Sequence, residues 1–311
     1  MKAQNFSIMG SNKTKSAVEK VAQWVFTFCA LCAVFAVFSI TAYMIINGTP
    51  ALAEVGVTDI LFGTVWKPTA GEPSYGILYV ILTSITGTAL AIFMGVPIGV
   101  MTAVFLAEAA PKKLARIVKP AVELLAGIPS IIYGLLGLMI LNPLVYKIET
   151  FLFKDSETHQ FTGGSNLISA VIVLAIMILP TVINISESAL RAVPKQYKEA
   201  SLAVGASHMQ TIFKVMIPAA KSGIITAIVL GVGRAIGEAM AISLVSGSVV
   251  NFPLPFNSVR FLTTAIVSEM GYAADTHRDV LFTIGLVLFL FIMIINIVMT
   301  RLLKGGTGNE S

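Results

Sequence analysis

Charged residues are scarce in this sequence, and their scarcity excludes the commonest class of protein. Only 12% of the 311 residues are charged and 56% are hydrophobic, whereas an ordinary soluble domain has about 25% charged residues. A soluble globular enzyme is therefore excluded. The hydrophobic runs instead predict one membrane-embedded unit.

The motifs that would mark a nucleotide, metal or nucleophile site are also absent. The sequence has no G-x-x-x-x-G-K-[ST], no H-E-x-x-H and no G-x-S-x-G pattern, which typify nucleotide, zinc and serine-hydrolase sites. His159, His208 and His277 are too far apart along the chain to suggest a metal cluster. We therefore expect no catalytic residue and no metal site in this chain.

Cysteine is nearly absent, and the two that occur form a C-x-x-C pair, Cys29 and Cys32, inside an apolar run. Such a pair is found in redox and metal sites. One helical turn between them gives poor disulfide geometry. We interpret both as small apolar residues of a membrane helix.

Long uncharged runs are what the sequence has in abundance. A crossing needs about 20 apolar residues, and we predict six transmembrane helices at about 21–46, 76–106, 121–146, 165–185, 222–250 and 280–300. The first is preceded by a polar tail, residues 1–20. Ala51-Leu52-Ala53 resembles a signal cleavage site, but signal h-regions span only about 7–15 residues. We therefore expect residues 21–46 to stay as an anchor.

The placement of basic residues predicts the orientation of these helices. With the N-terminus inside, fifteen of the 21 Lys and Arg residues fall in cytoplasmic segments and five in outer loops, as the positive-inside rule expects. Both termini, including a tail at 305–311, are then cytoplasmic. The net charge of +5 is explained by topology, so we expect no nucleic-acid partner.

The cytoplasmic segment 186–218 predicts two short helices joined at an elbow. Pro194 suits the start of the first helix, and Gly205 suits a left-handed C-terminal cap. Ser207 and Gln210 have capping-box spacing, which begins the second helix.

One face of the first elbow helix is small and apolar. Its members are Tyr197, Ala200, Ser201 and Val204. Such a face fits the groove of a partner protein or lies on lipid headgroups, and the spacing alone does not separate the two.

The elbow resembles the E-A-A-x3-G-x9-I-x-L-P signature of ABC importer permeases. It matches at Glu199, Ala200, Gly205 and Pro218, with Ser201 in place of the second alanine. The resemblance implies that the elbow is a coupling helix that docks into a cytoplasmic ATPase subunit. ATP and Mg would then be bound by that partner, with no cofactor in this chain.

The second chemical feature is a charged pair, Arg234 and Glu238, inside the fifth predicted helix. Each charge costs about 2.5–3.5 kcal/mol near mid-bilayer on insertion scales. Four residues apart, they share a helical face and are able to pair. The pair is either structural, facing another helix, or lies on a transport path, where the arginine fork suits oxyanions.

The third predicted helix has small residues and two polar candidates for the same path. Pro129 interrupts its hydrogen-bond ladder, and Gly134 permits close helix contacts. Ser130 and Tyr133 are candidate donors that line the path. The alternative is that this segment serves only helix packing.

The segments Gly231–Glu238 and Leu125–Gly134 are similar to those of phosphate-specific ABC permeases of the PstC type. Ala239 departs from the usual G-E-T-M pattern, which removes a hydroxyl from the path. The resemblance implies an all-α integral membrane protein with the type I ABC importer permease (MetI-like) fold over residues 21–304. It also implies a location in the bacterial inner membrane.

The resemblance further implies partners and a substrate. They are a PstA-type permease subunit, a PstB-type ATPase dimer and a PstS-type phosphate-binding protein, which would meet the outer loops 47–73 and 251–279. Inorganic phosphate would pass Arg234 and Glu238, with a second cation from the partner subunit. The alternatives are a sulfate or molybdate importer, a non-conducting phosphate-signalling scaffold, and a secondary transporter or channel.

Overall fold

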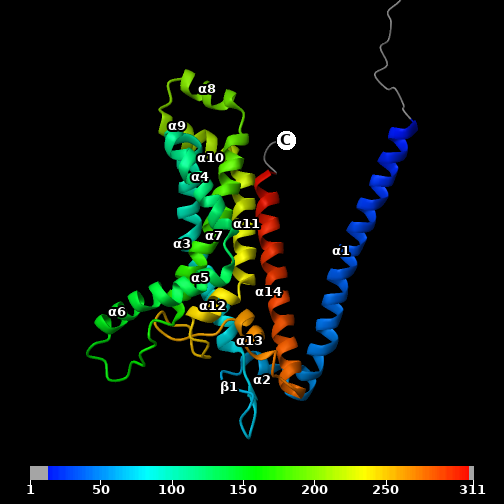
Figure 1. Cartoon of the computed structure of the whole chain (residues 1–311), viewed down its shortest axis with the longest axis vertical. Helices are drawn as coiled ribbons and strands as arrows, with labels where there is room; N and C mark the ends of the chain where they lie inside the picture. The colour runs from blue at the N-terminus through cyan, green and yellow to red at the C-terminus, as the bar shows by residue number, and fades with distance from the viewer. Residues whose placement is uncertain (1–12, 308–311) are drawn as a thin grey trace, which may run out of the picture.

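The computed structural model describes residues 13–307, and helices dominate it (Figure 1). The strands found within this range pair as one antiparallel hairpin, β1 (Trp66–Lys67) with β2 (Ser74–Tyr75). The helices are α1 (Lys13–Glu54), α2 (Val57–Phe62), α3 (Leu78–Val104), α4 (Lys112–Gly127), α5 (Ser130–Leu136), α6 (Asn142–Leu152), α7 (Leu167–Ala192), α8 (Lys195–Ala203), α9 (His208–Thr211), α10 (Ile217–Ala219), α11 (Lys221–Gly237), α12 (Met240–Val245), α13 (Leu262–Glu269) and α14 (Asp275–Thr307). Three π-helical turns lie at Phe105–Ala109, Gly137–Leu141 and Ile212–Met216.

Five helical segments are long and apolar enough to cross a membrane. They lie at Glu19–Glu54, Leu78–Ala109, Ser130–Leu152, Leu167–Ala192 and Asp275–Val298. A sixth follows if His208–Ala219 and α11, which meet at an angle of 69°, count as one broken span. This architecture confirms the expected all-α integral membrane fold.

The bundle is built around α7, the most buried of these segments. α3 and α11 pack along it, as Figure 1 shows. Glycines allow the close approach of α3: a Cβ at Gly95 would lie 2.7 Å from Ile178, and one at Gly99 would lie 2.8 Å from Val182. Larger residues at these positions would force the two helices apart.

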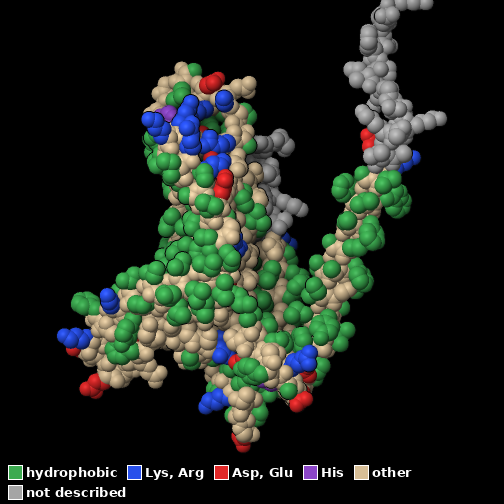
Figure 2. Space-filling view, viewed as in Figure 1, with side chains coloured by type: hydrophobic (Ala, Val, Ile, Leu, Met, Phe, Trp, Pro, Cys, Tyr) green, Lys and Arg blue, Asp and Glu red, His purple; other side chains and the backbone are tan. Residues whose placement is uncertain are grey.

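α1 leaves the bundle along most of its length (Figure 1). Its most apolar stretch has no buried residue, and Cys29 and Cys32 on it are exposed, free thiols. α1 contacts α14 near its C-terminal end, where Thr283 donates to the Gly48 carbonyl at 2.7 Å. Figure 2 shows hydrophobic side chains along α1 and over the flank of the bundle, with Lys and Arg gathered near α8 and α9.

The third predicted helix, 121–146, is wrong as one segment. α4 ends at Gly127, and a new helix begins at Ser130 and continues through α6 to Leu152. Pro129 has no N–H to donate, and the residue before a proline is driven out of the helical region. Ile128 accordingly has an extended conformation.

The fifth predicted helix, 222–250, is also wrong as one segment. α11 ends at Gly237, Glu238 adopts an extended conformation, and α12 covers only Met240–Val245. Gly237 weakens the helix, and the Glu238 side chain supplies the cap of the next one. The break therefore falls on one of the two charged residues.

Two predicted boundaries need smaller corrections. α7 runs to Ala192, so the first part of segment 186–218 belongs to that helix. α1 begins at Lys13, so residues 13–20 of the predicted N-terminal tail are helical. Residues 1–12 and 308–311 of the two predicted tails lie outside the described range.

Candidate functional site

The helix breaks at Glu238, four residues after Arg234, and the two charged side chains have different surroundings. Glu238 Oε1 accepts from the Ala241 N–H at 3.0 Å, which caps α12. The Glu238 carbonyl accepts from Thr263 Oγ1 at 2.7 Å. No ion pair joins Glu238 to Arg234 within the described range. The predicted pair is wrong, because the break turns the Glu238 side chain onto α12.

Arg234 is half-buried in the last turn of α11 and has no carboxylate within ion-pair distance in residues 13–307. The neighbouring glycines show where open space lies. A Cβ at Gly233 or Gly237 would meet no atom within 4 Å, whereas one at Gly231 would lie 3.0 Å from Val182 of α7. α11 is therefore packed against α7 at Gly231, whereas the positions of Gly233 and Gly237, before and after Arg234, are open.

Ser130 and Tyr133 lie at the neighbouring break. Ser130 begins α5 and is half-buried. The buried Tyr133 donates its hydroxyl to the Leu125 carbonyl at 2.7 Å, across the Gly127–Pro129 break. Tyr133 therefore stabilises the break, and its one O–H donor is engaged in that role.

The two breaks are held together by close packing of α5 on α12. A Cβ at Gly134 would lie 2.8 Å from the Ala241 Cα. The packing of α5 on α12 brings the break at Ser130 and Tyr133 next to the break at Glu238, and Tyr133 and Glu238 both make structural contacts there.

The elbow has the local structure that the sequence predicts. Gly205 has a φ of +87°, the left-handed conformation that glycine adopts most readily. Ser207 and Gln210 form a complete capping box at the start of α9. Ser201, on α8, and Thr211, on α9, share a hydrogen bond at 2.9 Å, which fixes the angle between these helices.

The apolar face of the elbow is open. Val204 is 85% exposed, and Tyr197, Glu199 and Ala200 are also exposed. A cleft of about 410 Å³ lies behind α8 and is lined by Glu108, Arg191, Lys198 and Met216 among others. Lys198 pairs with Glu108, which ties α8 to the end of the α3 segment. Pro218 lies in α10, just before the chain bends into α11.

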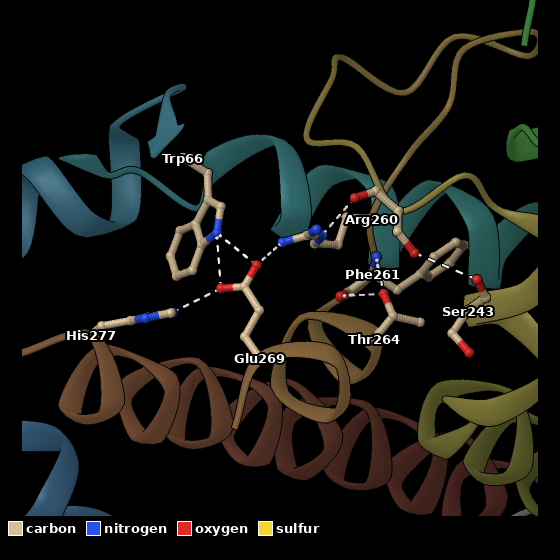
Figure 3. Close-up of polar contacts among 8 residues, drawn as sticks. Trp66, Ser243, Arg260, Phe261, Thr264, Glu269 and His277 are labelled. Atoms are coloured by element: carbon tan, nitrogen blue, oxygen red, sulfur yellow. Dashed lines mark hydrogen bonds and ion pairs between the residues drawn. The ribbon is translucent and has the colours of Figure 1, made fainter. Parts of the chain in front are cut away.

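Sequence reasoning missed a buried cluster around Glu269 (Figure 3). Glu269 is on α13, which lies at the end of the bundle opposite the elbow (Figure 1). The Glu269 carboxylate accepts from Trp66 Nε1 at 3.1 Å, contacts His277 Nε2 at 2.8 Å and pairs with Arg260. Burial and the Glu269 charge raise the pKa of the nearby Tyr272 phenol, against the effect of Arg260. The one sequence signal was that Glu269 is the only charged residue between Arg260 and Asp275.

A family model matches residues 95–305 of this chain, and it describes a binding-protein-dependent transport system inner membrane component. The match covers more than half of the sequence and includes both breaks and the elbow.

Two curated relatives match over most of their lengths. The chain is 37% identical to the probable ABC transporter permease protein YqgH of Bacillus subtilis, over 94% of this chain and 95% of that one. It is 35% identical to the phosphate transport system permease protein PstC of Pasteurella multocida, over 74% of each chain.

A solved structure shares the fold. It is a bacterial alginate ABC transporter in complex with an alginate pentasaccharide-bound periplasmic protein, with a TM-score of 0.59 and 13% identity. The similarity covers 93% of this chain and 96% of that chain. The expected type I ABC importer permease fold is thereby confirmed.

Proposed function

We propose, from the fact that this chain belongs to the binding-protein-dependent transport system inner membrane component family, that it forms the path of inorganic phosphate through an ATP-driven importer. The chain is a multi-pass membrane permease subunit of an ABC importer. The proposal adds the substrate, the residues that meet it and the identity of the partners.

The observation that carries the proposal is the state of Arg234. A charged side chain inside the bilayer is costly, and such residues usually pair with an opposite charge. Arg234 has no carboxylate partner in the described range and lies beside two open glycine positions. Its planar fork of donors is therefore available to the oxygens of an anion. Similarity to PstC of Pasteurella multocida favours phosphate as that anion.

One arginine does not neutralise a phosphate dianion, so the path needs a second cation. We assign it to a PstA-type permease subunit that faces the open positions of α11. Ser130 lies at the neighbouring break and supplies a hydroxyl to the same path. Glu238 shapes the break by capping α12 and holds a negative charge near the path, which limits how tightly phosphate binds.

The elbow would connect the proposed ATPase subunit directly to the helix that carries Arg234. α9, the π-helical turn and α10 lead into α11, which carries Arg234 sixteen residues after Pro218. We assign the exposed face around Tyr197, Ala200 and Val204 to a PstB-type ATPase dimer, which binds ATP and Mg. Closure of that dimer would then move the start of α11 and change the access to Arg234.

The remaining assignments concern orientation. We place the chain in a bacterial inner membrane, with both ends of the polypeptide in the cytoplasm. The start of α1 and the end of α14 lie at the same end of the molecule as the elbow (Figure 1). The opposite end, with loops 47–73 and 251–279, would receive a phosphate-loaded PstS-type binding protein.

The test is uptake of radiolabelled phosphate by vesicles that contain the assembled complex. Hydrogen bonds to charged groups contribute about 1.5–3 kcal/mol, so Arg234→Gln should lower the uptake rate about 10- to 150-fold. Arg234→Lys keeps the charge without the fork and should fall between Arg234→Gln and the unchanged chain.

Three outcomes would contradict the proposal. Undiminished phosphate uptake by Arg234→Gln would remove this residue from the path. Strong inhibition by excess sulfate would replace phosphate with a broader oxyanion selectivity. Uptake that persists without the ATPase subunit would identify a secondary transporter or channel instead.

A further inference from the structure

The short helix α13 is fastened at both ends by side-chain hydrogen bonds to different parts of the molecule. At its first turn, Thr263 Oγ1 donates to the Glu238 carbonyl at 2.7 Å. The Leu262 N–H donates to Ser84 Oγ of α3 at 2.9 Å. This end of α13 is thus attached directly to the break that carries Arg234 and Glu238.

The other end of α13 carries Glu269 and contacts three separate segments (Figure 3). Trp66 reaches the carboxylate from the β1–β2 hairpin, and His277 reaches it from the start of α14. Arg260 pairs with it from the loop after α12 and donates to the Ser248 carbonyl at 2.9 Å. The side chains of Glu269 and His277 are 5% and 9% exposed, so their contacts are shielded from water.

A helix held in this way transmits displacement from one end to the other. α13 has eight residues, and a rise of about 1.5 Å per residue gives a rigid length of about 12 Å. A second buried pair, Glu149 with His159 at 2.9 Å, has the same chemistry. It lies on α6 and its following loop and makes no contact with α13 in the hydrogen bonds of the described range.

We propose that α13 couples the β1–β2 hairpin to the break at Glu238, with Thr263 and Glu269 as positioning residues. This inference rests on the proposed function, in which a substrate-loaded binding protein docks on the outer loops. Docking displaces the hairpin and Trp66, and Glu269 moves with Trp66. The displacement of α13 then moves Thr263 and, through its hydrogen bond, the Glu238 carbonyl. The outer surface thereby controls the access of phosphate to Arg234.

The first experiment measures ATP hydrolysis by the assembled complex with and without a phosphate-loaded binding protein. Allosteric coupling of ordinary strength corresponds to about fivefold or more, so Thr263→Val and Glu269→Gln should each lower the stimulation ratio by at least about that factor. Two matched controls should keep the ratio of the unchanged chain. Thr283→Val removes a threonine–carbonyl bond of the same length outside α13, and Glu149→Gln alters the other buried Glu–His pair.

The second experiment shows whether the contacts of Trp66 with Glu269 still respond when the hydrogen bond at the other end of α13 is removed. The chain has two tryptophans, and Trp24 is 75% exposed on α1, so Trp24→Phe leaves Trp66 as the only one in this chain. The partner subunits and the binding protein are used with their tryptophans replaced by phenylalanine. The emission of Trp66 should then shift when the binding protein is added. The shift should persist in Thr263→Val, although stimulation of ATP hydrolysis is lost.

The two experiments distinguish a failure of the coupling role of α13 from a failure of the proposed transport function. If the unchanged complex shows neither phosphate uptake nor stimulation, the proposed function fails. If it shows both and Thr263→Val keeps the stimulation ratio, the coupling role of α13 is overturned. A Thr263→Val chain in which Trp66 no longer responds, or a control variant that loses stimulation equally, would also overturn it.

Discussion

Two arginines of this chain, Arg234 and Arg260, have opposite environments. Arg260 is half-buried, pairs with the buried Glu269 and donates a second hydrogen bond to the Ser248 carbonyl. Arg234 is half-buried at a helix break, without a carboxylate partner in residues 13–307. A paired guanidinium fixes neighbouring segments to one another, whereas an unpaired one keeps its donors for an anion from outside the chain. The difference separates a structural contact at Arg260 from the proposed transport site at Arg234.

The largest effect is expected from removing the paired arginine. Arg260→Gln leaves the Glu269 charge buried without the arginine cation, which should lower the unfolding free energy by about 3–5 kcal/mol. Thermal unfolding of the purified complex should show the loss. Arg278→Gln, at an exposed position, is the control and should change little. An Arg260→Gln chain as stable as the control would mean that Glu269 does not depend on this pair.

Removing the unpaired arginine should not lower the unfolding free energy. Arg234→Met takes a charge out of the bilayer without stranding a partner, so the unfolding free energy should stay constant or rise, by up to about 2.5–3.5 kcal/mol. The same unfolding experiment measures it. A clear loss of stability would show that Arg234 is paired in the complex, and the contrast with Arg260 would disappear.

The open and packed positions of α11 are distinguished by thiol labelling. After Cys29→Ala and Cys32→Ala, a cysteine placed at Gly233 or at Gly231 is the only thiol of this chain. Gly233→Cys should react with a water-soluble maleimide at least about tenfold faster than Gly231→Cys, since tenfold corresponds to only about 1.4 kcal/mol of difference in access. Phosphate should slow the labelling at position 233. Equal rates at both positions would contradict an open path beside Arg234.

The smallest effect is expected at the neighbouring break. Tyr133→Phe removes the hydrogen bond to the Leu125 carbonyl and should lower the unfolding free energy by about 0.5–1.5 kcal/mol. Phosphate uptake should fall less than in Arg234→Gln, because the tyrosine donor is engaged within the chain. An uptake loss as large as that of Arg234→Gln, at nearly unchanged stability, would instead make Tyr133 a ligand of the anion.

Features that depend on a few adjacent residues could be predicted from the sequence. Gly205 and the capping box of Ser207 and Gln210 have the conformations expected of them, because their physical causes are local. The spans could be found for a similar reason, since crossing a bilayer requires a continuous apolar run.

The two helix breaks were missed because an uncharged run shows where a membrane is crossed but does not require one straight helix. Pro129 was recognised as an interruption, but the hydrogen bond by which Tyr133 spans the gap joins residues eight positions apart and has no signal in the local pattern. At Glu238, the spacing of four from Arg234 indicated a shared helical face. That inference failed because the carboxylate caps α12 instead.

The Glu269 cluster was beyond sequence reasoning for a different cause. Trp66 and Glu269 are 203 positions apart, and their contact depends on how the β1–β2 hairpin and α13 pack. No local propensity or short motif encodes such a contact. The paired Arg260 and the unpaired Arg234 of the proposed transport site can therefore be told apart only in the three-dimensional structure.

A cryo-electron microscopy map of the assembled importer with phosphate bound would decide whether Arg234 acts on the anion. We predict phosphate oxygens within hydrogen-bond distance of the Arg234 guanidinium, in a passage between α11 and the second permease subunit. A guanidinium closed against a carboxylate of that subunit, with phosphate elsewhere, would contradict the role assigned to this residue.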